Sequence, residues 1–169
     1  MTSNDVLRRL RYIFDLSDSA VIGIFALADL EVSREQISNW LKKDDDPEMV
    51  RIKDVQLATF LNGLINELRG KREGEQPKPE QSLNNNIILR KLKIALNLQA
   101  EEMLALLEGS SVQLSKHELS AFFRKEGHKH YRNCKDQVLR NVLNGLQQKY
   151  REEGEKNEDE AESSPYWKS

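Results

Sequence analysis

Leu61-Asn62-Gly63-Leu64 returns later in the chain as Leu143-Asn144-Gly145-Leu146, and this repeated stretch decides the fold. Outward from it, residues 4–69 align with residues 86–151 at a constant shift of 82 positions and without a gap. Identical pairs recur along the whole alignment, among them Leu7/Leu89, Leu16/Leu98, Ser33/Ser115, Lys53/Lys135 and Asp54/Asp136. Such a repeat indicates one folding unit present in two copies.

Each copy contains four segments whose apolar residues fall at helical spacing, and no segment has the alternation of a strand. In the first copy these segments are residues 6–14, 20–28, 33–41 and 54–68. Ser33 with Gln36, and Ser115 with Glu118, have the spacing of an N-terminal capping box. Residues 20–28 are apolar nearly all round, which predicts that this helix is the buried core helix.

We therefore predict an all-α protein of two homologous four-helix repeats, residues 1–69 and 86–151. The intervening residues 70–85 contain Pro77 and Pro79 and almost nothing apolar, which indicates a linker. Residues 152–169 are rich in glutamate and lack a periodic apolar face, so we expect a disordered acidic tail. A repeat of this size buries little surface alone, so the two copies should share an interface.

Gly63 and Gly145 lie inside the fourth helix of each copy, where glycine is about 1 kcal/mol less favourable than alanine. Because both copies keep it, we expect the close approach of another backbone. That backbone belongs either to a helix of the protein itself or to a docked partner.

Several classes of protein are disfavoured by composition. The chain has no apolar run of about 18 residues and no basic segment followed by an apolar one at its start, so we expect neither a membrane span nor a secretory signal. Cys134 is the single cysteine, which rules out an internal disulfide framework and suits a cytoplasmic protein. Its counterpart in the first copy is Ile52, which predicts a buried core position.

The residues offer little support for a metal, a cofactor or catalysis. His128, His130 and Cys134 are metal-ligand types, but their counterparts in the first copy include isoleucine. The sequence has no glycine-rich phosphate loop and no HExxH zinc motif. We expect no metal, no cofactor and no enzymatic activity.

Charge is distributed unevenly. Residues 86–151 carry 12 Lys or Arg against 6 Asp or Glu, whereas residues 152–169 carry 2 against 7. The loop after the third helix is acidic in the first copy, residues 44–48, and basic in the second, residues 128–132. Cations grouped on one surface can replace counterions around phosphates. The candidate anion or nucleic-acid contacts are Arg90, Lys91, Lys93, Lys116, Arg124, Lys125, Lys129 and Lys135.

The acidic tail suggests two further hypotheses. Its acids could fold back on the basic second repeat and compete with an anionic ligand. Alternatively, Tyr166 and Trp167 near its end are candidates for docking on a partner protein.

Parts of the sequence resemble a known protein family and a known DNA-binding unit. Residues 8–12 with Asp15-Leu16, and residues 60–64 with their twin 142–146, resemble the YehS-like bacterial family of tandem-repeat proteins of unknown function. This resemblance covers both repeats, implies a cytoplasmic bacterial protein and supplies no activity. Residues 27–41 resemble a helix-turn-helix DNA-binding unit whose recognition helix opens with Ser33-Arg34. An ordinary packing corner is the alternative interpretation.

The sequence thus leaves two functions open and does not determine either. The first is a non-enzymatic cytoplasmic module for protein interaction or regulation, using an apolar groove between the repeats. The second is a nucleic-acid-binding protein that uses the helix-turn-helix-like segments and the basic face of the second repeat. The sequence does not specify the oligomeric state.

Overall fold

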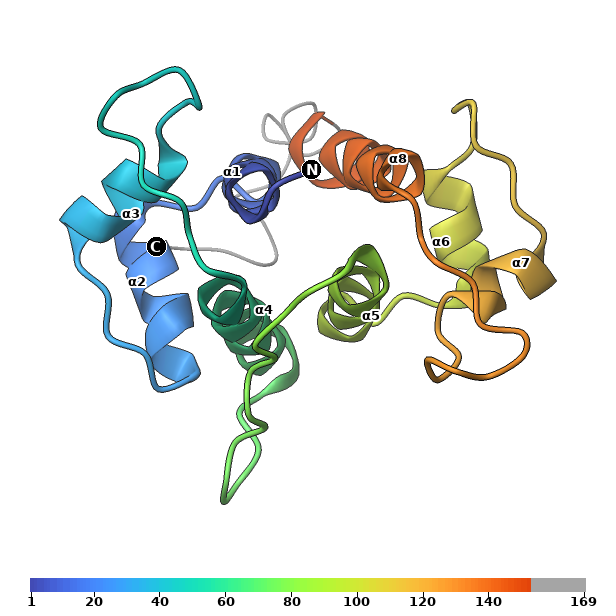
Figure 1. Cartoon of the computed structure of the whole chain (residues 1–169), viewed down its shortest axis with the longest axis horizontal. Helices are drawn as coiled ribbons and strands as arrows, with labels where there is room; N and C mark the ends of the chain where they lie inside the picture. Colours follow the sequence, from blue (N-terminus) through green and yellow to red (C-terminus); the bar gives the residue numbers. More distant parts are fainter. Residues whose placement is uncertain (153–169) are drawn as a thin grey trace, which may run out of the picture.

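The structure, a computed structural model, describes residues 1–152, and all regular structure in that range is helical. The first repeat contains α1 (Ser3–Ile13), α2 (Asp18–Leu27), α3 (Arg34–Leu41) and α4 (Asp54–Arg69). The second contains α5 (Asn85–Ala95), α6 (Ala100–Leu106), α7 (Lys116–Ala121) and α8 (Asp136–Gln147), followed by a π-helical turn, η1 (Gln148–Glu152). The prediction of an all-α chain with two four-helix repeats is confirmed (Figure 1). The tail expected to be disordered lies outside the described residues from residue 153 onward.

The helix ends lie where the local sequence predicts them. Ser33 Oγ accepts a hydrogen bond from Gln36 N at 3.1 Å, and Gln36 Oε1 accepts one from Ser33 N at 2.9 Å. Ser115 and Glu118 form the same capping box at α7. Gly70 ends α4 with a φ of +91°, in the left-handed region that favours glycine.

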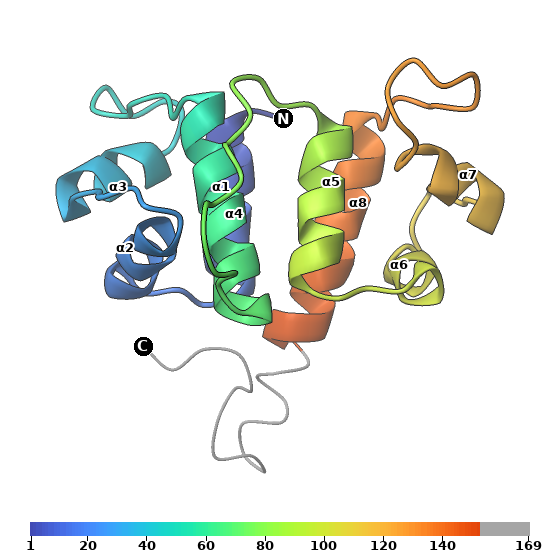
Figure 2. The same ribbon diagram turned by 90° about the horizontal axis from the view of Figure 1, so that it is seen from below.

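Four long helices form the centre of the molecule, and the shorter helices cover its two ends (Figures 1 and 2). In the centre, α4 packs on α5 and α1 packs on α8, so the first and fourth helices of both repeats meet there. The α2–α3 pair covers one end and the α6–α7 pair covers the other. One hydrophobic core runs through both repeats, which are therefore halves of one body. None of the helices within residues 1–152 is long and apolar enough to span a membrane.

The prediction that the second helix is the core helix is wrong. α2 buries Val21, Ile24 and Phe25 but exposes Gly23 and Ala26, because it lies on the outside of the central bundle. α4 is the core helix instead: residues 57–64 are all buried, since α2 packs on one side of α4 and α5 on the other. The outer face of α2 looks apolar in sequence because it carries small residues, which need no burial.

Gly63 and Gly145 mark close contacts between helices, as expected. A Cβ atom at Gly63 would lie 1.9 Å from the carbonyl oxygen of Ile24 in α2. One at Gly145 would lie 2.3 Å from the carbonyl oxygen of Leu106 in α6. The approaching backbone is therefore the second helix of the same repeat.

An approximate two-fold axis relates the repeats. Lys91 Nζ donates to Asn62 Oδ1 at 2.6 Å, and the equivalent Arg9 Nη2 donates to Asn144 Oδ1 at 2.7 Å. Each bond joins one repeat to the other. The donor of the first bond belongs to the second repeat, and the donor of the second bond belongs to the first repeat. Reciprocal contacts of this kind are what a two-fold arrangement of equivalent halves produces.

The second repeat departs from this symmetry in its helix lengths. α6 ends at Leu106, whereas α2 continues to Leu27, the counterpart of Gly109; α8 changes to a π-helical turn at η1 where α4 continues as an α-helix. In η1, the ring of Tyr150 packs edge-on against Phe14 of the first repeat, with centroids 5.2 Å apart. Local π-helical geometry here accompanies a contact between the repeats.

Candidate functional site

The loop between α7 and α8 is held in place by a single buried amide. Asn86 is 7% exposed; its Nδ2 donates to the carbonyl oxygens of Phe122 at 3.0 Å and Arg132 at 2.7 Å. Its Oδ1 accepts a hydrogen bond from Cys134 N at 2.9 Å. Asn4 makes the equivalent three bonds to the loop after α3. Both ends of each loop are thereby tied to the first helix of its repeat.

This fixed loop carries most of the predicted cations. We define the basic end of the molecule as α7 together with residues 122–135. Two of its cations are neutralised: Lys116 pairs with Glu101, and Arg132 Nη1 lies 3.1 Å from Glu118 Oε2. Four others are exposed and take part in no ion pair within residues 1–152, namely Arg124, Lys125, Lys129 and Lys135. With six cations against Glu118 and Glu126, the basic end keeps a net positive charge on a loop that Asn86 anchors.

Three histidines also gather at the basic end. The His128 and His130 ring centroids are 5.6 Å apart, and those of His117 and His130 are 6.3 Å apart. His130 N donates to His128 Nδ1 at 3.0 Å, so that nitrogen is an acceptor in this arrangement. Within the part of the chain that the structure describes, no three His, Cys, Asp or Glu residues are placed to hold a metal ion.

Cys134 lies inside, beneath this loop. It is 5% exposed, and burial raises the pKa of its thiol to about 12. A thiol with that pKa stays protonated at neutral pH and is a poor nucleophile and metal ligand. The prediction of a buried core cysteine is confirmed.

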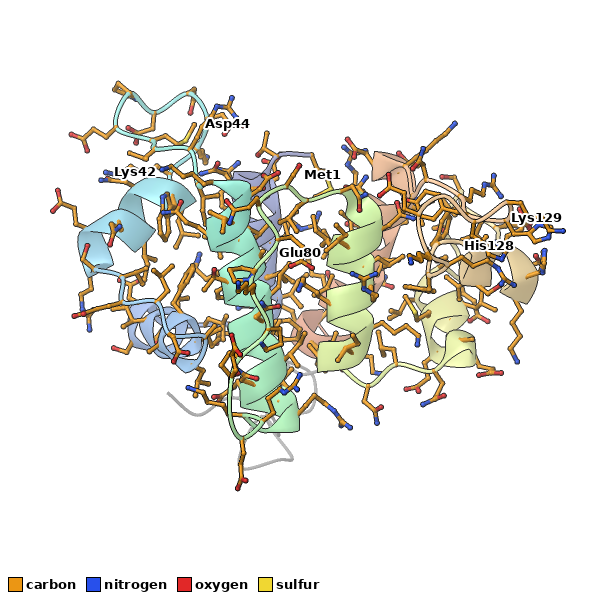
Figure 3. The ribbon with its side chains drawn as sticks, turned by 60° about the horizontal axis from the view of Figure 1, so that its bottom comes forward. Met1, Lys42, Asp44, Glu80, His128 and Lys129 are labelled. Carbon is orange, nitrogen blue, oxygen red and sulfur yellow. The ribbon has the colours of Figure 1, made fainter. Side chains whose placement is uncertain are left out.

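The equivalent loop of the first repeat is an acidic end. Residues 42–48 contain Asp44, whose carboxylate lies 3.2 Å from Arg8 Nη2, and Glu48, whose carboxylate lies 2.8 Å from Lys42 Nζ. Figure 3 shows Asp44 at one end of the molecule and His128 and Lys129 at the other. The two-fold arrangement thus places loops of opposite charge at opposite ends.

The three predicted contacts on α5 do not form one surface with the basic end. Lys91 is 8% exposed, and its ammonium lies between Asn62 and Glu80, 2.9 Å from the Glu80 carboxylate. Arg90 is exposed and lies 4.0 Å from the same carboxylate. Lys93 extends over the Phe123 ring, 5.4 Å from its centroid, and so borders the basic end. Lys135 lies at the start of α8. Tyr166 and Trp167 lie outside the described residues.

The helix-turn-helix-like segments occupy the two ends of the molecule. In the first repeat, α2 and α3 are joined by residues 28–33; in the second, α6 and α7 are joined by the longer segment 107–115. α7 spans only Lys116–Ala121. The candidate recognition helices α3 and α7 therefore differ in length, connection and neighbouring charge.

Sequence comparison relates both repeats to one family. The model of a family described as "Protein of unknown function (DUF1456)" matches residues 3–70 and again residues 85–152. The chain belongs to this family.

A relative supports this assignment across most of the chain. The "Uncharacterized protein YehS" of Escherichia coli (strain K12) is 44% identical over 147 residues, which cover 86% of this chain and 94% of that protein. No solved structure matches the chain significantly. The two matches to the DUF1456 model confirm the tandem repeat.

Sequence reasoning missed two residues that organise the site, Asn86 and Glu80. Asn86 left a usable signal, because Asn4 and Asn86 are polar residues that stay identical within otherwise apolar helix faces. No signal in the sequence marks Glu80, because its partner Lys91 lies on another element and the linker around Glu80 has no periodic pattern.

Proposed function

We propose that this DUF1456 protein is a non-enzymatic interaction module that binds an acidic surface of a partner protein through its basic end. The observation that carries the proposal is the group of exposed, uncompensated cations at Arg124, Lys125 and Lys129, on a loop held by Asn86. Opposite charges across an interface steer association and select partners. A preorganised loop also loses less conformational entropy on binding.

The arrangement of the two ends favours a protein partner over duplex DNA. Two-fold helix-turn-helix proteins place both recognition helices against one duplex. Here the end beside α3 carries Asp44, Asp45 and Glu48, which a phosphate backbone would repel. At α7, Lys116 and Arg132 are already paired with carboxylates. Binding of one DNA duplex by α3 and α7 together is therefore electrostatically unfavourable.

Nucleic acid is the second candidate, through the basic end alone. The four exposed cations without an ion pair there, with Phe123 nearby beneath Lys93, form a surface of the kind that binds single strands. Binding of this kind weakens steeply as salt rises, because it depends on counterion release.

The test compares two charge-reversed proteins that carry the same net charge. One has Arg124→Glu, Lys125→Glu and Lys129→Glu; the control has Lys43→Glu, Arg51→Glu and Lys78→Glu, which are exposed cations away from the basic end. Each is used for affinity capture from a bacterial lysate, and its binding to labelled poly-glutamate, duplex DNA, single-stranded DNA and RNA is measured by fluorescence anisotropy.

The proposal expects poly-glutamate and specific captured proteins to bind the wild type and the control but not the basic-end variant. Salt-sensitive nucleic-acid binding that only the basic-end variant loses, without such protein binding, would establish the second candidate. Equal binding by both variants to every probe would contradict both candidates.

A further inference from the structure

The linker lies over the groove between α4 and α5. From its middle, Glu80 places its carboxylate 2.9 Å from Lys91 Nζ, and Gln76 Oε1 accepts a hydrogen bond from Asn66 Nδ2 at 3.1 Å. At its end, Leu83 N donates to Asp54 Oδ2 at 3.0 Å. Figures 2 and 3 show the linker running along α4 and α5, with Glu80 between the two helices. A cavity of about 400 Å³ remains there, lined by Pro77 and Pro79 among others.

The two-fold arrangement creates an equivalent groove beside α8. Its walls are α8, η1 and residues 106–110 at the end of α6, and Arg9 of α1 donates to two of its lining residues, Asn144 and Gln147. The groove has a volume of about 450 Å³. Six of its lining residues lie 82 positions after residues that line the linker groove; Asn141, Asn144 and Gln148, for example, correspond to Thr59, Asn62 and Asn66. We use the name α1–α8 groove for this groove together with the adjoining face of α1 that carries Arg9.

A buried donor in the α1–α8 groove lacks a partner among residues 1–152. Asn141 is 8% exposed, and its Nδ2 is buried without a hydrogen bond there. A buried, unsatisfied amide donor costs about 1–3 kcal/mol. The position therefore calls for an acceptor from outside the described part of the chain.

Glu108 and Glu152 line this groove, but neither pairs with Arg9 at its α1 edge. Lys91 has Glu80 as its ion-pair partner, whereas the equivalent Arg9 donates only to the neutral amides of Asn144 and Gln147. Burial lowers the pKa of the Arg9 guanidinium, and the charge of Arg140 lowers it further. No ion pair within residues 1–152 involves either arginine. Two neighbouring cations, one of them half-buried, favour the approach of an anion.

We propose that residues 153–169 bind in the α1–α8 groove as the linker binds in the α4–α5 groove. An acidic side chain of this segment then pairs with Arg9 and Arg140, and a polar atom accepts from Asn141 Nδ2.

The position, length and charge of residues 153–169 fit this role. They follow α8 and η1 as the linker follows α4. The linker uses residues 70–83 to reach Asp54, and the chain continues for 17 residues beyond Glu152. In residues 153–169, six acids stand against two lysines. Glu162 lies 82 positions after Glu80, the residue that pairs with Lys91.

The far end of the groove is also equivalent. Leu83 and Met1 are separated by the same 82 positions. Where Leu83 N bonds Asp54, the Met1 ammonium bonds Asp136 Oδ2 at 2.5 Å, and this contact lowers the pKa of the Asp136 carboxyl. The far end of the α1–α8 groove therefore matches the far end of the groove along which the linker runs.

A nitroxide spin label on Ser163→Cys in the full-length chain tests the proposal. Cys134 is buried and its pKa is about 12, so a thiol reagent at neutral pH labels the new cysteine selectively. The label broadens the NMR resonances of nearby amides. The equivalent α4–α5 face provides an internal reference, because Thr59, Asn62 and Ile94 correspond to Asn141, Asn144 and Tyr12.

We expect the amides of Asn141, Asn144 and Tyr12 to lose most of their intensity, and those of Thr59, Asn62 and Ile94 to lose much less. Salt at about 0.5 M, which screens charges beyond a few ångströms, should restore the intensity. Arg140→Gln should restore it in part; this residue is exposed, so the variant keeps its fold. A matched control, Lys125→Gln with Lys129→Gln, should leave the broadening unchanged.

Two results would overturn the proposal. Broadening centred on residues 124–132 and removed by the control would place the segment on the basic end instead. Broadening no stronger than that from the same concentration of free label would show that the segment binds neither surface.

Discussion

At the scale of single residues, Gly63 has no room for a side chain. Gly63→Ala gains about 1 kcal/mol of helix propensity, but its Cβ would lie 1.9 Å from the Ile24 carbonyl oxygen. The neighbouring atom belongs to backbone, so α2 and α4 must separate, at a cost near the upper end of the usual range for overpacking, roughly 2–3 kcal/mol. Because the clash outweighs the propensity gain, we predict a net loss of stability of about 1–2 kcal/mol in urea unfolding.

Gly23→Ala is the matched control. Gly23 lies inside α2, but a Cβ there would meet nothing within 4 Å. The same substitution should therefore stabilise the protein by up to about 1 kcal/mol through helix propensity. A loss of stability in both variants, or a gain in both, would contradict the packing argument.

Asn86 supports a second prediction, because its amide makes three hydrogen bonds to the loop that carries the candidate site. Asn86→Ala leaves those backbone groups without their partner, which should cost about 2 kcal/mol of stability. The loop should also open more readily, seen as faster hydrogen exchange at the Cys134 amide.

Asn133→Ala, an exposed change in the same loop, should alter neither quantity. Unchanged protection of the Cys134 amide in Asn86→Ala would show that the loop does not depend on this amide.

At the scale of elements, the sequence predicts local features well and spatial ones poorly. The capping box at Ser33 and the stop at Gly70 depend on neighbouring residues, so their spacing alone predicts them. The exposure of α2 and the burial of α4 depend on which helix packs in the middle, which periodicity does not encode. The position of a charged side chain also depends on the packing. Five of the eight predicted cations lie at the basic end, whereas Lys91 is buried against Asn62 of the other repeat.

The sequence does not reveal that the linker contributes to stability, and the ion pair between Glu80 and Lys91 makes this contribution testable. Glu80→Gln removes the carboxylate that pairs with the buried Lys91 ammonium. Because Glu80 itself is partly exposed, the loss should stay below that of a fully buried pair, at about 1–2 kcal/mol.

Thermal unfolding measures this loss, and Glu73→Gln is the control. Glu73 is an exposed linker residue that takes part in no ion pair within residues 1–152. We expect it to leave the unfolding temperature unchanged. Equal melting of Glu80→Gln and the wild type would mean that the linker does not contribute to holding the repeats together.

At the scale of the whole molecule, the two repeats form one core. Reciprocal bonds from Lys91 and Arg9 cross the interface, and Phe14 packs on Tyr150 across it. Neither repeat buries its central helices alone, so separating them would expose the apolar faces of α1, α4, α5 and α8. The molecule should therefore unfold in one cooperative transition.

Two probes, one in each repeat, test this cooperativity. Trp40 is buried in the first repeat, and its fluorescence reports that half once Trp167→Phe removes the other indole. Cys134 reports the second half, because its thiol is buried with a pKa of about 12 and regains an ordinary reactivity only on unfolding. Both probes should give the same midpoint in urea.

Gly63→Ala then distinguishes one cooperative body from two adjoining ones. The substitution lies in the first repeat, at the α2–α4 contact, far in sequence from Cys134. If the shared core couples the repeats, it lowers the midpoint reported by Cys134 as much as that reported by Trp40. If the repeats unfold independently, only the Trp40 midpoint falls and the Cys134 midpoint stays where it is in the unsubstituted chain. We expect the two midpoints to fall together, because the interface between α4 and α5 cannot survive in a molecule that has lost α4.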